Sequence, residues 1–514
     1  MSEPSPDPVI ELHTVVTRDG KVYEVEVIPT NEEKAQEEEA KRAWTARCQT
    51  EFSETTTRHT IRLRYADIAA YLRDRFHVIP FNGKAFVYHP ESGTYMEDMG
   101  ELIKVIHSIA ETVDYKESLT KAIREIMAYV MSFEVFRDYP FNQGKDIIPV
   151  KNGVVKIDYD TGTVLLLPHS PEHRITFSLP VVYDPAASNE AFHDTVISQY
   201  VEEDLVDILY MIPAIALLQS QGTKPYKKAF ILQGDANAGK TTYLEWLTRL
   251  FGPENISRAS LQQVTQDRFI NGVLEGKLFN AFDDLSDVPL ETVGQFKALT
   301  GGFDHQVERK HANPYQSRIF AVHCFSCNAP PDVPEKVVYD GAFWERWEYI
   351  NFLNIFDTDT GFNDRAFTEE NISGSFNAII EMMIKIRRSG MPINSTASEV
   401  KQAWQIAADP FAKFLFDHTV SLLPSQEPWL FNKAKLLASF QDYCQKTNQS
   451  ERKIPRTLKA LSTMAFKNGF KDVKRGPAKE RKYFYEAPRR WKEDSPYAKT
   501  AQQEMTDDTT LEGV

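Results

Sequence analysis

A glycine-rich segment carries the most specific chemistry in this sequence. Residues 234–241 read GDANAGKT and fit the pattern G-x-x-x-x-G-K-[ST] at every fixed position. The glycines let backbone N–H groups turn inward around a polyphosphate, the lysine reaches the β- and γ-phosphates, and the threonine hydroxyl takes a Mg²⁺ position. The alternative is an ordinary turn between a strand and a helix. The pattern favours an ATP site (a P-loop) with contacts from Gly234, Asp235, Ala236, Asn237, Ala238, Gly239, Lys240, Thr241 and Thr242.

A pair of acidic residues offers the carboxylate that a P-loop needs for its metal ion. The apolar run 277–282 ends in Asp283 and Asp284. We expect Asp283 to join Thr241 around Mg²⁺ and Asp284 to polarise the attacking water, a role more often given to glutamate. A turn capped by aspartate at the end of a strand is the alternative.

These residues need a sheet and helices to position them. Residues 229–233 (AFILQ) predict a buried strand before the glycines, and residues 241–251 predict a helix that stops at Gly252-Pro253. From residue 227 to about 388, β-rich runs alternate with helical segments. This alternation is typical of an α/β sheet, so the fold class is a multi-domain α/β protein.

Further motifs follow in a fixed order and carry a family resemblance. They are FKALTGG at 296–302, VERKH at 307–311, FAVHCFSCN at 320–328 and GAFWERW at 341–347. Together with the P-loop and the acidic pair, this set resembles superfamily 3 helicases, in particular the helicase half of phage, plasmid and poxvirus primase-helicases. Asp284 departs from the family pattern, where glutamate is common.

The resemblance implies an AAA+-like ATPase core that forms a ring, with a hexamer as the expected state. It implies that Asn328 senses the γ-phosphate and that Arg346 acts as an arginine finger in a neighbouring subunit's site. It also implies a hairpin that carries basic residues to single-stranded DNA. The candidate DNA contacts of this region are Lys297, Arg309, Lys310 and His311.

The rest of the chain suggests additional parts. Residues 150–167 predict a hairpin, residues 65–76 a helix, and residues 202–218 a buried helix. Segments such as LPHSPE at 167–172 make the upstream module resemble the family's usual partner domain. We predict a polar tail over 1–59, an α+β module over 60–200, the ATPase core over 201–400, a basic domain over 408–492 and a disordered acidic tail over 493–514.

The basic domain is a local exception in an acidic chain. The net charge is −14 overall, yet residues 451–492 contain 14 Lys+Arg against 4 Asp+Glu. Predicted helices followed by a basic strand pair have the order of a winged helix. A basic island of this kind favours DNA binding over a merely solvated face. The candidate contacts are Lys471, Lys474, Arg475, Arg481 and Lys482.

Several classes of protein are disfavoured. The longest apolar run, residues 208–218, is shorter than the ~18 residues of a membrane span, and the start MSEPSPDP has no features of a secretory signal. The sequence has 4 cysteines, which fits a reducing host cytoplasm. Cys324-x-x-Cys327 is interpreted as buried packing, and Asp158-x-Asp160 as a hairpin turn and not a primase metal site.

We therefore expect an ATP-dependent DNA helicase of superfamily 3 that translocates on single-stranded DNA during replication of a virus, prophage or plasmid. Its expected partners are single-stranded and forked DNA, further copies of itself, and a separate primase or other replication proteins; a membrane is not expected. The second hypothesis is a replication initiator or partition protein that binds DNA under an ATP switch and does not unwind it.

Overall fold

The computed structural model describes residues 12–16, 22–26, 31–132, 136, 139–142, 146–222, 224–286, 288–310, 313–393, 395–423, 425–447, 454–475 and 482–498. The chain divides into two compact units, Met1–Tyr183 and Asp184–Val514. Among the helices in these ranges, none is both long enough and apolar enough to cross a membrane.

The first unit packs helices around small antiparallel sheets. Amphipathic helices α2 (Tyr65–Phe76), α3 (Met99–Thr112) and α4 (Leu119–Ser132) bury their apolar stripes against one another. The remaining elements are α1 (Asn31–Thr50), β1 (Leu12–Val16), β2 (Val22–Glu26), β3 (Ser53–Thr55), β4 (Ile61–Leu63), β5 (Ile79–Phe81), β6 (Lys84–His89), β7 (Thr94–Glu97), β8 (Ile147–Val150), β9 (Gly153–Asp158) and β10 (Thr163–Leu167). The predicted helix 65–76 and the hairpin of β9 and β10 are confirmed.

The predicted polar tail over 1–59 is wrong for its last part. Cys48 and Phe52 are buried in the core of the first unit, and Trp44 packs against the same cluster. Helix α1 is charged along most of its length, so its average composition is polar. Trp44, Cys48 and Phe52 are nevertheless spaced four residues apart, so they lie on one face of the helix and of the residues that follow it. The module therefore includes residue 44 and does not begin at residue 60.

A parallel sheet organises the second unit. Its order is β12 (Ile256–Ser257), β13 (Phe279–Phe282), β16 (Val322–Cys327), β11 (Ala229–Gln233) and β17 (Trp347–Asn351), and every neighbouring pair is parallel. The predicted α/β sheet is confirmed. All four residues of the run Ala229–Leu232 are fully buried because helices cover both faces.

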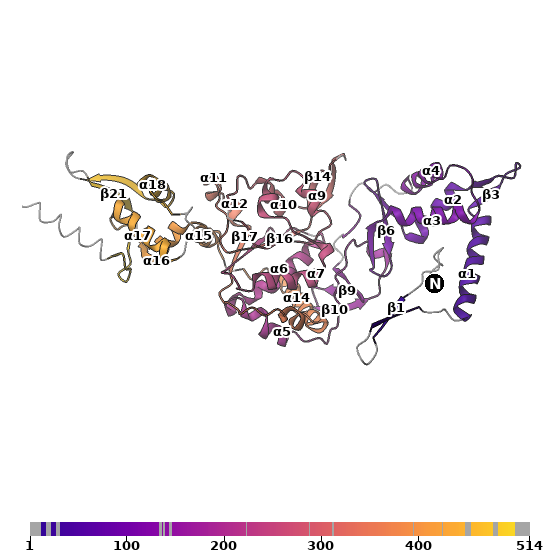
Figure 1. Cartoon of the computed structure of the whole chain (residues 1–514), viewed down its shortest axis with the longest axis horizontal. Coiled ribbons are helices and arrows are strands. Elements are labelled where there is room, and N and C mark those ends of the chain that lie inside the picture. The colour runs from indigo at the N-terminus through magenta and orange to yellow at the C-terminus, as the bar shows by residue number, and fades with distance from the viewer. Residues whose placement is uncertain are drawn as a thin grey trace, which may run out of the picture. The chain divides into compact units, whose positions relative to one another are not determined.

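Helices form a layer on each side of this sheet. One face packs against α10 (Gly294–Gly301), α12 (Gly341–Trp344) and α15 (Ala397–Ala408), and the other against α6 (Val206–Ser220), α7 (Lys240–Phe251) and α14 (Glu369–Ser389). Figure 1 shows β16 and β17 between these two groups. The predicted buried helix over 202–218 corresponds to α6. The shorter elements are α5 (Glu190–Thr195), α8 (Leu261–Gln266), α9 (Ile270–Leu274), β14 (Asp304–Val307), β15 (Tyr315–Arg318), α11 (Glu335–Val338) and α13 (Phe362–Ala366).

The two compact units divide ahead of residue 200, where the sequence predicted the end of the upstream module. The second unit begins at Asp184, so α5 and the residues after it belong with the sheet. Phe192 of α5 packs against Trp246 of α7 with ring centroids 5.6 Å apart. Pro185, Ser188 and Asn189 follow this point, so the sequence carries a local turn signal there that the predicted bounds did not use.

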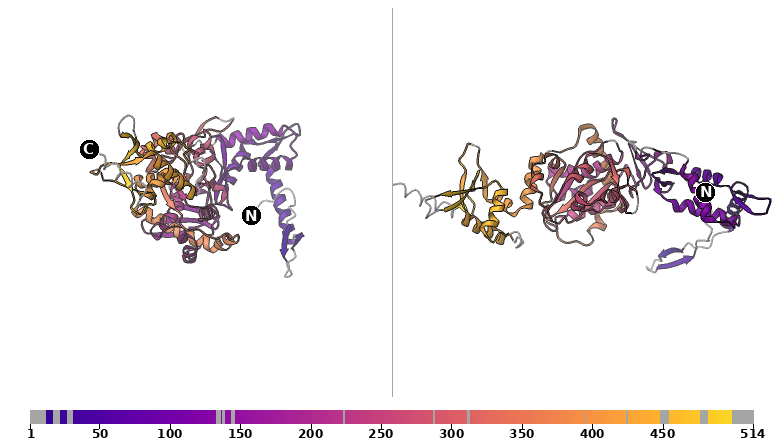
Figure 2. Two further views of the ribbon diagram at one scale, coloured as in Figure 1. Left: turned by 60° about the vertical axis from the view of Figure 1, so that its left-hand side comes forward. Right: turned by 90° about the horizontal axis from the view of Figure 1, so that it is seen from above.

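The C-terminal part follows α15 and has its own apolar core. In chain order it contains α16 (Pro410–His418), β18 (Thr419–Ser421), β19 (Trp429–Asn432), α17 (Lys433–Lys446), α18 (Leu458–Lys467), β20 (Lys471–Arg475), β21 (Lys482–Ala487) and β22 (Arg489–Trp491). Strands β19, β21 and β20 form an antiparallel sheet, and the β20–β21 hairpin is the yellow ribbon in the right-hand view of Figure 2. Tyr497 and Ala498 are buried in this core, so the predicted disordered tail does not begin at residue 493.

Candidate functional site

The glycine-rich segment forms a tight turn between β11 and α7. Gly239 has φ +86°, and a Cβ at this position would lie 2.3 Å from Cε1 of Tyr200. A Cβ on Gly234 would lie 2.6 Å from the carbonyl oxygen of Phe352. Close packing therefore requires glycine at both positions, and at Gly239 the positive φ favours glycine as well.

Lys240 lies inside this turn. Its ammonium group donates hydrogen bonds to the carbonyl oxygens of Gly234 and Asp235, at 2.7 and 2.8 Å, and to Oδ1 of Asn328 at 3.0 Å. The side chain is buried, and this burial lowers the pKa of Lys240 below its usual value. Because all three acceptors are neutral oxygens, the positive charge of Lys240 can attract a phosphate.

The acidic pair lies beside the P-loop threonine. Thr241 Oγ1 donates to Asp283 Oδ2 at 2.7 Å. Ser326 Oγ donates to the other carboxylate oxygen of Asp283 and accepts the backbone N–H of Asp284 at 2.9 Å. Asp284 has φ +56° and an exposed side chain. A hydroxyl and a carboxylate are the oxygen donors that Mg²⁺ prefers, so this pair fits the metal.

The sheet order explains this convergence. Strand β16 lies between β11 and β13, and the P-loop, Asn328 and Asp283 each follow the carboxyl end of one of these strands. Carboxyl ends of parallel strands share one edge, which is where open α/β sheets bind ligands. The structure therefore brings together Lys240, Thr241, Asp283, Asp284 and Asn328.

A cavity of about 610 Å³ opens beside the P-loop. Besides residues 237–242, two segments that the motifs did not indicate line it: residues 195–200 and residues 356–363. Backbone hydrogen bonds from Leu353 to Tyr200, at 3.2 Å, and from Phe356 to Asn237, at 2.9 Å, tie these segments to the P-loop. In the sequence, the only signal was the aromatic run around Phe352 and Phe356 after a strand.

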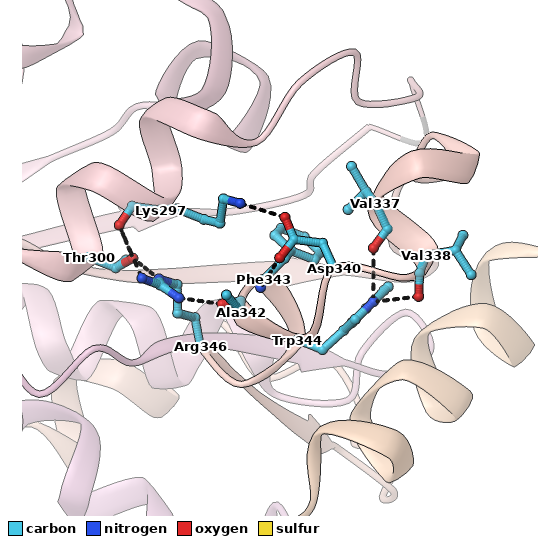
Figure 3. Close-up of polar contacts among 9 residues, drawn as sticks. All are labelled: Lys297, Thr300, Val337, Val338, Asp340, Ala342, Phe343, Trp344 and Arg346. Carbon is cyan, nitrogen blue, oxygen red and sulfur yellow. Dashed lines mark hydrogen bonds and ion pairs between the residues drawn. The ribbon is translucent and has the colours of Figure 1, made fainter.

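Arg346 lies away from this group. Its carbonyl accepts the N–H of Ala229 at 2.7 Å, so it stands at the start of β11, whereas the P-loop follows the end of that strand. Five residues of strand separate the two, a length of about 13 Å. The guanidinium is hydrogen-bonded to α10 and to Ala342, as Figure 3 shows. One chain does not bring Arg346 to its own P-loop.

The predicted DNA contacts between residues 297 and 311 lie on different elements of the second unit. Lys297 forms an ion pair with Asp340 at 2.5 Å, and Arg309 forms one with Glu275 at 2.7 Å. Strands β14 and β15 form the expected hairpin, and Lys310 is exposed near its tip. His311 lies outside the described residues.

The basic residues of the C-terminal part lie on β20 and β21. Lys471 and Lys474 are exposed on β20, and the ammonium group of Lys474 lies 5.9 Å from the centre of the Tyr483 ring. Arg475 and Lys482 are paired in the antiparallel register, while Arg481 lies outside the described residues. DNA binding by all these residues stays a prediction.

Two smaller sequence interpretations can be compared with the structure. Cys324 and Cys327 are fully buried on β16, and burial raises the pKa of both thiols, that of Cys327 to about 12. Their interpretation as core packing is confirmed. Asp158 accepts the N–H groups of Asp160 and Thr161 at 2.9 and 3.1 Å, which confirms a hairpin turn.

Two protein families match parts of the chain. Residues 64–199 match the family described as "D5 N terminal like", and residues 232–346 match a "Family of unknown function (DUF5906)". The second range runs from the end of β11 to Arg346 and contains the glycine-rich turn, the acidic pair and Asn328. No curated protein matches.

Solved structures with similar backbones include "The apo structure of NrS-1 C terminal region (305-718)". This chain is 13% identical to it, with a TM-score of 0.43, and the match covers 82% of this chain and 98% of that one. "The A form apo structure of NrS-1 C terminal region-CTR(305-718)" is 11% identical with a TM-score of 0.41, covering 81% and 98%.

Proposed function

We propose that the protein is an ATP-dependent DNA helicase of superfamily 3 that acts as a ring, expected to be a hexamer, during replication of a virus, prophage or plasmid. The observation that carries the proposal is the hydrogen bond between Thr241 and Asp283, beside the bond between Lys240 and Asn328. These contacts join the P-loop to an acid and an amide from two neighbouring strands, as phosphate cleavage requires.

The residues have separate roles at the carboxyl edge of the sheet. Thr241 Oγ1 and Asp283 would hold Mg²⁺, which when bound draws charge from the β- and γ-phosphates. Lys240 would bind the phosphates. Its hydrogen bond to Asn328 would link the end of strand β16 to the position of the γ-phosphate. Asp284, held at its backbone by Ser326, would orient the attacking water.

The cavity next to the P-loop suits the nucleoside part of ATP. Residues 195–200 and 356–363 face it from two sides, and Tyr200 and Phe356 supply aromatic surface. Tyr200 and Phe356 lie edge to face, with ring centroids 5.9 Å apart. Packing of this kind leaves a rigid apolar wall for a planar base.

The position of Arg346 supports a site shared between two copies. An arginine finger neutralises the charge that develops on the transferred phosphoryl group. Since Arg346 stands at the opposite edge from its own P-loop, the finger would come from a neighbouring subunit. The sheet order, with β11 between β16 and β17, supports an AAA+-like core of this type.

DNA would be bound at two places. The β14–β15 hairpin, with Arg309, Lys310 and His311, would contact the phosphates of single-stranded DNA. The C-terminal part has the element order α16, β18, β19, α17, α18, β20, β21. Without the short strand β18, which pairs with β22, this is helix, strand, helix, helix, strand, strand, which supports a winged helix that holds forked or duplex DNA. The match of residues 64–199 supports an upstream partner module, and a separate primase or other replication proteins would act alongside.

Lys240→Ala tests the proposal. We expect loss of ATP hydrolysis by about 10³-fold or more and loss of strand displacement on a fork, because the phosphate charge is then unopposed. Lys121→Ala, on helix α4 of the first unit, is the control and should behave as wild type. Sizing with and without ATP and a fork should show the ring.

Unwinding by Lys240→Ala protein would overturn the assignment of the P-loop as the ATP site that drives strand separation. Nucleotide-dependent DNA binding by wild-type protein without any strand displacement would instead favour the ATP-switched initiator.

A further inference from the structure

Helix α10 holds the side chain of Arg346 through its last turn. Arg346 Nε donates to Thr300 Oγ1 at 2.8 Å, and Nη2 donates to the carbonyl oxygen of Lys297 at 3.4 Å. Thr300 Oγ1 itself donates to the carbonyl of Phe296 at 2.8 Å, so its lone pairs are free to accept from the guanidinium. Figure 3 shows Arg346 pointing at this turn.

A second contact joins the same two elements. The ammonium group of Lys297 pairs with Asp340 Oδ2 at 2.5 Å, and Asp340 Oδ1 accepts the N–H of Phe343 at 3.1 Å at the start of α12. The hydrogen bond from Lys297 lowers the pKa of Asp340 below its usual value. The pair is roughly three-quarters buried, so solvent screens it less than it would an exposed pair. It holds α12, which precedes Arg346, against α10.

The apolar faces beneath these contacts are closely packed. The ring of Phe296 on α10 is stacked on Trp347, with centroids 4.8 Å apart, and contacts Phe343 edge to face at 5.8 Å. Displacement of α10 therefore moves the segment around Arg346, because a packed interface of this kind transmits shifts.

Helix α10 also leads directly into the basic hairpin. Only Gly302 and Phe303 separate its last residue from β14. Phe303 packs against Phe320 at 5.0 Å, and its carbonyl accepts the N–H of Ile319 at 2.8 Å, next to the other hairpin strand. The base of the hairpin is thus continuous with the helix that holds Arg346.

We propose that Thr300 is a positioning residue for Arg346, braced by the Lys297–Asp340 pair, and that it couples the hairpin of one subunit to ATP cleavage in the neighbouring subunit's site. This rests on the proposed function, in which Arg346 acts in trans and the hairpin contacts DNA. A hairpin drawn along DNA shifts the last turn of α10, and Thr300 passes the shift to the guanidinium.

Thr300→Val tests the hydroxyl, because valine keeps the shape and removes both hydrogen bonds. We expect kcat for ATP in the presence of single-stranded DNA to fall about tenfold with KM unchanged, since the P-loop is intact. Thr300→Ser should restore most of kcat. Thr248→Val is a matched control: Thr248 Oγ1 also donates to a carbonyl four residues back and accepts from an arginine, Arg258. It should leave kcat unchanged.

The decisive measurement is a double-mutant cycle with Arg346→Ala. If Thr300 acts through Arg346, Thr300→Val should add no loss to Arg346→Ala. Asp340→Asn keeps the oxygen that caps α12 and removes the charge, so it should lower kcat about threefold and also add nothing to Arg346→Ala. This second variant decides the case if Thr300→Val does not fold.

The outcomes separate the two proposals. If Arg346→Ala alone leaves kcat unchanged, the arginine finger of the proposed function is overturned, and the coupling with it. If Arg346→Ala lowers kcat but Thr300→Val has no effect, raises KM alone, or lowers the rate further on the Arg346→Ala background, only the positioning role is overturned.

Discussion

The two edges of the central sheet differ in how complete their chemistry is within one chain. At the carboxyl edge, three neighbouring strands bring together a lysine, a threonine, an acid pair and an amide, with hydrogen bonds from Lys240 to Asn328 and from Thr241 to Asp283. At the amino edge, the described hydrogen bonds of the Arg346 guanidinium go only to helix α10 of the same chain and to the carbonyl of Ala342. The first edge therefore gathers its lysine, hydroxyl, carboxylates and amide within one chain, whereas Arg346 at the second edge is remote from the glycine-rich turn.

This difference shows how the residues for one reaction can be divided between two copies of a chain. Strands fix the direction in which their ends point, so residues at opposite edges cannot meet in one sheet. A finger at the amino edge can serve a site at the carboxyl edge only if another subunit presents it. The predictions below use this contrast.

Mixing inactive variants gives the largest expected effect. Lys240→Ala and Arg346→Ala proteins should each lose about 10³-fold in ATPase activity. When they are mixed in equal amounts, up to about a quarter of the shared sites contain both intact halves, because such assemblies pair a patch of one copy with a different patch of the next. Steady-state ATPase assays should therefore show rescue.

The matched control mixes Lys240→Ala with Asp283→Ala. Both lesions lie at the carboxyl edge of the same chain, so no arrangement restores a site and no rescue is expected. Rescue in this mixture, or none in the first, would contradict the division of the site between the two edges.

Gly239→Ala should weaken ATP binding about 100-fold. The new Cβ meets the ring of Tyr200 at 2.3 Å, and the residue has φ +86°, so overpacking and backbone strain of ~1–3 kcal/mol each add up. Titration calorimetry with ATP measures the loss. Gly276→Ala separates the two causes, because Gly276 has φ +75° but open space around its Cβ position. If Gly239→Ala binds ATP as wild type does, Tyr200 does not pack under the P-loop.

Ser326→Ala should lower kcat about tenfold with little change in ATP affinity. The change removes a donor to Asp283 and leaves the N–H of Asp284 without its partner, and a hydrogen bond to a charged group contributes ~1.5–3 kcal/mol. Initial rates against ATP concentration give both constants. The control is Ser220→Ala, another buried serine, which bonds the carbonyl of Leu217 at 2.7 Å. An unchanged kcat would exclude Ser326 from the site.

Lys310→Ala should give the smallest effect. We expect DNA stimulation of the ATPase to fall about threefold, and the slope of log affinity against log salt to become shallower by about 0.7, as for one lost phosphate contact on a single strand. Lys336→Ala, an exposed lysine on α11, should change neither quantity. An unchanged salt slope for Lys310→Ala would remove this residue from the DNA path.

The accuracy of the sequence predictions follows how local each signal was. Strand β11 has the predicted bounds, and α7 begins one residue before the predicted helix, because the strand, the glycines and the helix are contiguous. Asp283 and Asn328 were placed correctly beside the P-loop since each simply ends an apolar strand. By contrast, Cys48 and Phe52 were assigned to a tail because the apolar positions of α1 are few and its overall composition is polar.

The sequence alone determined which residues gather at the carboxyl edge, because GDANAGKT, Asp283 and Asn328 each directly follow an apolar run that forms a strand of the sheet. Only the tertiary structure showed that residues 195–200 and 356–363 wall the cavity and that Thr300 holds Arg346. Neither has a sequence pattern of its own. Their positions depend on how helices pack against the sheet, and that packing brings together residues far apart in the chain.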